Sequence, residues 1–63
     1  MKIIWNNNVA SWSPGYTLEI VKLQAGWDAR LREFGVIVKH SFPYDDPSTA
    51  KQHAEQLALE RWG

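Results

Sequence analysis

The 63-residue sequence contains no cysteine. A disulfide bond and a zinc site built from thiolates are therefore both excluded. The chain also has no excess of charge, because seven Lys and Arg residues balance seven Asp and Glu residues. Strong non-specific binding to nucleic acid or to an anionic membrane needs net positive charge, so this balance weighs against both.

Long apolar runs are absent as well. No run approaches the ~20 residues that a membrane span needs. Only two apolar residues follow Lys2 before Trp5 and three asparagines, which does not resemble a signal peptide. Without a signal peptide and without cysteine, we expect a cytoplasmic protein that has no membrane partner.

Aromatic residues are abundant instead, with four Trp, two Tyr and two Phe. A chain of this length forms one domain, residues 1–63, and buries only about 60% of its unfolded surface. Large rings compensate for such a small core, because each can bury ~150–250 Å². The alternative is that some rings are exposed as contact residues, since Trp is enriched in binding hot spots. Trp5, Trp12 and Trp62 are the candidates for protein binding.

The middle of the chain, from Gly26 to Phe42, is typical of a β-hairpin. Trp27, Ala29 and Leu31 alternate with charged residues, which places these three side chains on one face of a sheet. Gly35 is the natural point of reversal, because glycine adopts positive φ without steric cost, and a bulge inside a longer loop is the alternative. The alternation then resumes to Phe42.

The preceding segments predict further strands. Tyr16–Leu23 has strand composition and follows the turn Ser13-Pro14-Gly15. Lys2–Trp5 and Val9–Trp12 are candidates for short strands, and the asparagines between them indicate a turn. Apolar residues fall on both faces of Tyr16–Leu23, which indicates either a bulge or burial on two sides. Burial on two sides requires a homodimer partner or the N-terminal segment.

The C-terminal quarter predicts a helix over Ser48–Trp62, which has neither Gly nor Pro. Asp46 suits the N-cap, and Pro47 suits the first helical position, where its missing N–H is not needed. One stripe of the helix faces the sheet; its members are Ala50, Ala54, Leu57, Ala58, Arg61 and Trp62. Leu59 lies off this stripe as a candidate exposed contact.

Basic residues gather on one side of the predicted sheet. Arg30 and Arg32 share the face opposite Trp27, and the alternation of the next strand adds Lys39 to it. Lys22 is a fourth candidate for this nucleic-acid-binding face. Asp28 and Glu19 dilute its positive charge. Solvated charges that keep a bare sheet face soluble are the alternative interpretation.

The pattern of three strands and one helix resembles two related DNA-binding domains, those of plant ethylene-response factors and the arm-binding domains of tyrosine integrases. The resemblance covers roughly residues 16–58. It depends on the following residues: Trp27-x-Ala29-x-Leu31, Gly35, Phe42 and Thr49-Ala50-x-x-x-Ala54. In these families the sheet enters the major groove. The resemblance therefore implies groove-facing roles for Arg30, Arg32, Lys39 and Trp27.

No residue pattern indicates catalysis, a metal site or a cofactor. The chain has no G-x-S-x-G turn, no phosphate-binding glycine loop and no histidine spacing typical of metal ligands. We therefore predict a non-enzymatic α+β domain with an antiparallel three-stranded sheet, room for a short N-terminal fourth strand, and one C-terminal helix. The first hypothesis is a small accessory protein of phage or mobile-element type that contacts duplex DNA through its sheet face. The second is a protein-binding module or inhibitor that acts through exposed aromatic residues or a sheet edge.

Overall fold

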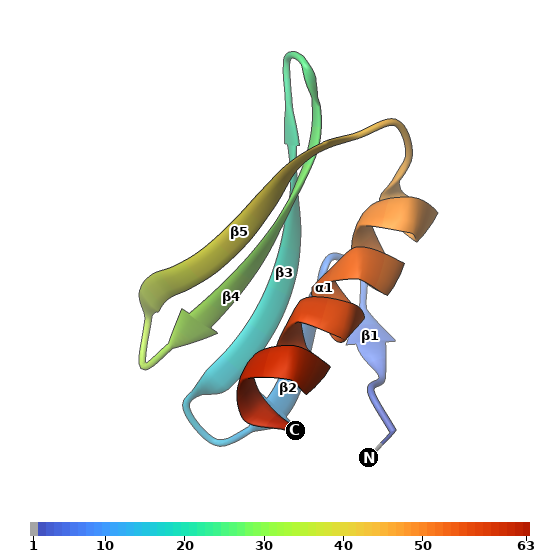
Figure 1. Ribbon diagram of the computed structural model, residues 1–63. Helices are drawn as coiled ribbons and strands as arrows, with labels where there is room; N and C mark the ends of the chain where they lie inside the picture. Colours follow the sequence, from blue (N-terminus) through green and yellow to red (C-terminus); the bar gives the residue numbers. More distant parts are fainter. Residues whose placement is uncertain (1) are drawn as a thin grey trace.

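Five consecutive strands form one antiparallel sheet, and the C-terminal helix packs on one side of it (Figure 1). The computed structural model describes residues 2–63. Its elements are β1 (Trp5–Asn6), β2 (Val9–Ser13), β3 (Tyr16–Leu23), β4 (Gly26–Glu33), β5 (Val36–Tyr44) and α1 (Pro47–Trp62). Each strand pairs with the next, so the order in the sheet is β1-β2-β3-β4-β5. The predicted α+β class is confirmed, whereas the predicted count of three or four strands is too low.

The N-terminal hairpin accounts for the difference in strand count. Asn6 pairs with Val9, so only Asn7 and Asn8 form the turn. Asn7 has φ 58°, a left-handed conformation that Asn tolerates better than most residues and that tight hairpins require. A turn of two residues rather than three moves the first strand to Trp5–Asn6.

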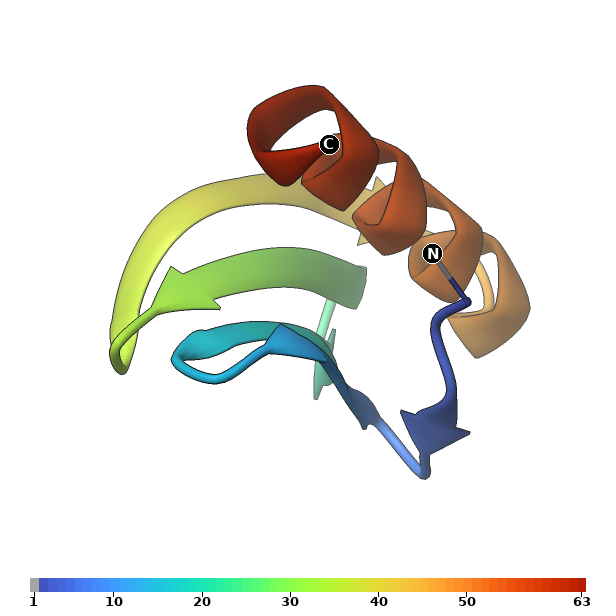
Figure 2. The same cartoon turned by 90° about the horizontal axis from the view of Figure 1, so that it is seen from below.

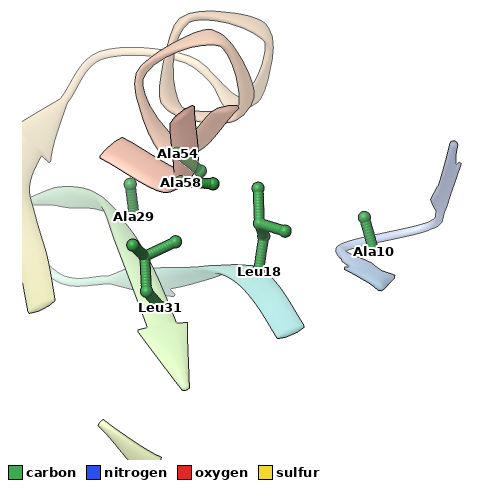
Figure 3. Close-up of a cluster of buried hydrophobic side chains, with 6 residues drawn as sticks. All are labelled: Ala10, Leu18, Ala29, Leu31, Ala54 and Ala58. Carbon is green, nitrogen blue, oxygen red and sulfur yellow. The ribbon is translucent and has the colours of Figure 1, made fainter. Parts of the chain in front are cut away.

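The hydrophobic core lies between α1 and the middle of the sheet (Figure 3). Leu18 of β3 pairs with Leu31 of β4, and both side chains are fully buried. Ala29 of β4 and Ile20 of β3 form the adjacent pair. The helix contributes three buried alanines, Ala50, Ala54 and Ala58. Small side chains let the helix axis approach the sheet closely. The predicted helical stripe is confirmed for its three alanines, whereas Arg61 at its end is exposed. The predicted core face of β4 is confirmed for Ala29 and Leu31.

The helix begins where the sequence predicts. The backbone N–H of Thr49 donates to the carboxylate of Asp46 at 2.8 Å, and Pro47 occupies the first turn. At the other end, the N–H of Gly63 donates to the carbonyl of Leu59 at 3.0 Å. The predicted N-cap is therefore confirmed.

The sheet is strongly curved, and the helix lies on its inner side (Figure 2). Near one edge of the sheet, the indole N–H of Trp5 donates to Glu55 at 2.7 Å, and Lys51 Nζ lies 5.4 Å from the centre of the Trp5 ring. At the opposite edge, the Tyr44 ring stacks on His53 with centroids 4.5 Å apart. Side chains from both edge strands thus hold α1 in place, and the outer side of the sheet faces away from it.

Candidate binding surfaces

The outer side of the sheet carries a network of ion pairs. Arg32 Nε lies 2.8 Å from a Glu19 oxygen, and Arg30 Nε lies 2.9 Å from Asp28 Oδ2. Arg30 also reaches Glu19 at 3.9 Å. Two cations and two anions therefore neutralise one another here. Arg32 additionally donates to the carbonyl of Gly35 at 2.8 Å, which ties the β4–β5 turn to this network.

The two lysines predicted to extend this surface lie elsewhere. Lys39 pairs with Leu31, so it lies on the helix side of β5, where it lines a shallow pocket with Leu57. The cause is a register shift around Val38, which moves the alternation of β5 by one residue. Lys22 pairs with Trp27 and its Nζ lies 5.7 Å from that ring, so it too is on the side of the core residues. The expectation that these lysines share a face with the arginines is therefore wrong.

Asp28 is the one buried charged residue of the described chain, with 5% of its surface exposed. Its Oδ2 accepts the bond from Arg30, while Oδ1 is buried without a hydrogen-bond partner. Nδ1 of His40 lies 3.5 Å from this oxygen. The sequence places Asp28 on the correct face but gives no sign of its burial. His40 and His53 lie on opposite sides of the sheet, since His40 pairs with Arg30 while His53 is on the helix.

The three tryptophans predicted to bind proteins are all half-buried and pack against the core. Trp5 is held by its bond to Glu55. Trp12 and Trp62 meet at the C-terminal end of the helix, with ring centroids 6.0 Å apart. The structure thus brings two of the three residues together and leaves the third in a different place.

These two rings and Tyr16 line a recess, which we call the aromatic recess: Trp12, Ser13, Tyr16 and Trp62, enclosing about 200 Å³. The Tyr16 and Trp62 rings meet edge to face, with centroids 5.3 Å apart. Within residues 2–63, the indole N–H of Trp12 and the hydroxyl of Tyr16 have no hydrogen-bond partner. The sequence predicts Trp12 and Trp62 as contacts but not Tyr16, whose position follows only from the pairing of β2 with β3.

Glu33 at the end of β4 fixes the helix end that forms the recess. Its Oε2 accepts from the Trp62 indole at 2.6 Å and from Arg61 Nε at 2.7 Å. These two bonds, the Arg61 bond first, hold the pKa of Glu33 below its ordinary value. Arg61 was expected to face the sheet as part of the helical stripe, and its contact with Glu33 explains why that position is not apolar.

The β4–β5 turn holds a large ring in an unfavourable conformation. Phe34 has φ 52° and Gly35 has φ 86°, the two positive values of a tight hairpin turn. Positive φ is rare for a bulky residue. Phe34 is 75% exposed, and its ring meets the Tyr16 ring edge-on, with centroids 5.5 Å apart. Its ring lies across Gly15, where an added Cβ would come within 2.4 Å of it. The predicted reversal at Gly35 is confirmed.

The outer edge of β5 is a second exposed feature, which we call the β5 edge. β5 is the last strand in the order, and its nine residues make it the longest strand. Exposed apolar side chains gather along it and its preceding turn; they are Phe34, Val36, Ile37 and Phe42. The other edge strand, β1, has only two residues. The alternation of the sequence predicts the strand but not its edge position, which depends on the pairing of all five strands.

Residues 2–63 contain no group of three or more His, Asp or Glu side chains that could hold a metal ion. The described helix is not long and apolar enough to cross a membrane. Comparison with known proteins adds no further constraint, because no family model, curated protein or solved structure matches the chain.

Proposed function

We propose that this protein is a protein-binding domain that adds an extended segment of its partner to the sheet at the β5 edge. The observation that carries this proposal is the exposed apolar surface of a nine-residue strand that pairs with β4 on one side and, within residues 2–63, has no neighbouring strand on the other. An edge strand presents a row of unused N–H and C=O groups, to which another chain can bond. Side chains that alternate along the added strand then supply specificity.

The position of protective residues supports this use of β5. Proteins commonly protect a free edge by charge, proline or shortness. Of the residue types Lys, Arg, Asp and Glu, β5 contains only Lys39, and Pro43 lies next to the C-terminal end of the strand. The stretch from Val36 to Phe42 is therefore available, and at ~3.3 Å per residue it extends for roughly 23 Å. β1, by contrast, is protected by its shortness.

Duplex DNA binding through the sheet face stays a prediction, and the geometry favours it less. Phosphate binding depends on Lys and Arg side chains that are free to neutralise phosphates. Arg30 and Arg32 are engaged with Glu19 and Asp28, and both lysines lie on the other side. A phosphate would have to compete with these existing ion pairs for both arginines, which reduces the electrostatic gain.

The proposal is tested by selecting binding peptides from a displayed library of random decapeptides. We expect the selected peptides to alternate in polarity and to lose binding to Ile37→Lys, which adds a charge to the β5 edge. Val9→Lys is the matched control, because Val9 and Ile37 are similarly exposed, at 47% and 42%. Both variants should fold, since surface substitutions usually change stability by less than about 0.5 kcal/mol. Equal loss of binding in both variants would refute the β5 edge as the site.

A further inference from the structure

The aromatic recess contains no residue of β5 and has no part in strand addition at the β5 edge. We propose that the recess is a second binding site, which takes a proline-rich segment in the polyproline II conformation. The inference goes beyond the proposed function, because it concerns different residues and a different backbone conformation of the ligand.

The size of the recess limits what it can hold. Pockets for small molecules and cofactors usually enclose ~300–1,000 Å³, whereas the recess encloses about 200 Å³. It therefore accepts one or two side chains of a longer ligand rather than a whole cofactor. A peptide that lies across the surface and inserts only part of itself satisfies this limit.

The lining of the recess distinguishes between two kinds of ligand that aromatic residues recognise. Centroid distances of 5.3 and 6.0 Å, for Tyr16 with Trp62 and for Trp12 with Trp62, are those of rings in direct contact, so neither pair leaves a gap between its two rings. Within the described residues, the lining also has no carboxylate to balance the charge of a quaternary ammonium group, which favours a neutral ligand. A ligand lies against the ring surfaces instead, as the rigid rings of proline do in aromatic-lined grooves.

The polar groups of the recess match a neutral ligand that offers acceptors. Two charged side chains lie beside the recess: Glu33, which accepts from the Trp62 indole, and Arg61, which precedes Trp62 in the chain. They neutralise each other, with Arg61 Nε 2.7 Å from Glu33 Oε2. The Trp12 indole N–H and the Tyr16 hydroxyl are free to donate. A polyproline II segment has no internal hydrogen bonds, so its carbonyl oxygens are free to accept from both.

The test is a titration of the ¹⁵N-labelled protein with acetylated hexaproline, observed through its four tryptophan indole N–H signals. We expect the signals of Trp12 and Trp62 to shift, with half-saturation below about 1 mM, while those of Trp5 and Trp27 stay in place. Trp12→Phe should weaken binding about 3- to 10-fold through loss of the indole donor. Trp5→Phe, which also replaces an indole by a phenyl ring, should not.

Several results would overturn the inference. These are the absence of any shift with 1 mM hexaproline, equal shifts with a Gly-Ser hexapeptide, or tighter binding of a trimethyllysine peptide. Equal weakening by Trp5→Phe and Trp12→Phe would also contradict it. Ile37→Lys separates this site from the β5 edge: it should leave hexaproline binding unchanged even where it abolishes binding of the selected decapeptides.

Discussion

Gly15 and Gly35 provide an internal comparison of how the Phe34 ring is held. Their φ angles are 85° and 86°, so replacing either by alanine imposes nearly the same backbone strain. The surroundings differ. A Cβ at Gly15 would lie 2.4 Å from the Phe34 ring, whereas a Cβ at Gly35 would meet nothing within 4 Å. The difference between the two variants therefore reports the contact of the ring with the rest of the protein.

The expected magnitudes follow from these contacts. A non-glycine residue in the left-handed region costs roughly 1–2 kcal/mol, which both variants share. The methyl group of Gly15→Ala also displaces the Phe34 ring from Tyr16, and an aromatic pair contributes about 0.5–1.5 kcal/mol. Gly15→Ala should therefore destabilise the protein by about 1 kcal/mol more than Gly35→Ala. In a domain of this size, 1 kcal/mol corresponds to a shift in the unfolding midpoint of roughly 4–8 °C.

Urea unfolding followed by circular dichroism measures the free energies of unfolding of both variants, alone and combined with Phe34→Ala. The extra cost of Gly15→Ala should disappear once the ring is removed, because the ring is what the added methyl group meets. The Phe34 N–H also donates to the Gly15 carbonyl at 2.6 Å, and Phe34→Ala keeps this backbone bond. Equal destabilisation by the two alanines in the wild-type background would refute the reasoning. An extra cost that persists with Phe34→Ala would show that Gly15 is needed for another reason.

Three further predictions concern the charged groups. The pKa of Glu33 is lowered from 4.5, so the stability that Glu33 contributes is present above pH 4.5 and is lost as the pH falls through its folded pKa. In Glu33→Gln, the free energy of unfolding should therefore depend less on pH in that window. Asp46→Ala removes the acceptor of the Thr49 N–H and should lower the thermal midpoint, whereas Asp46→Asn should restore most of it. Duplex DNA binding at low salt should be weak, with a salt dependence that Arg30→Ala changes little; a steep dependence reduced by that variant would favour the DNA hypothesis.

Local signals in the sequence predict much of this fold. The N-cap at Asp46, the reversal at Gly35 and the core face of β4 each depend on residues close together in the chain. Capping, turn geometry and alternation act over a few residues, so one sequence is enough to find them. The strand count was too low because β1 has only two residues, too few for any periodic pattern.

The candidate sites were less predictable, because each depends on pairing between distant residues. The register shift near Val38 reverses the faces of β5 and removes Lys39 from the expected basic surface. No residue pattern in the sequence indicates such a bulge. Glu19 meets Arg32 only through the pairing of β3 with β4. The sequence therefore predicts that acidic residues dilute the positive charge of this face, but not which ion pairs form.

Self-association is a competing use of the same edge. The apolar residues on both faces of β3 predict cover by either a homodimer partner or the N-terminal segment, and Val21 and Leu23 are half-buried in the single chain. Two copies paired through β5 would form one continuous sheet around a two-fold axis. Sedimentation with and without Ile37→Lys distinguishes this use, since a dimer that involves the β5 edge should dissociate in the variant.

Amide hydrogen exchange of the protein, measured with and without a selected decapeptide, tests strand addition at the β5 edge most directly. Amides of β5 that are not bonded to β4 should exchange rapidly in the free protein. We predict that the peptide slows alternate amides between Val36 and Phe42 and leaves those of β2 unchanged. Unchanged exchange throughout β5, with the peptide bound, would contradict the proposed function.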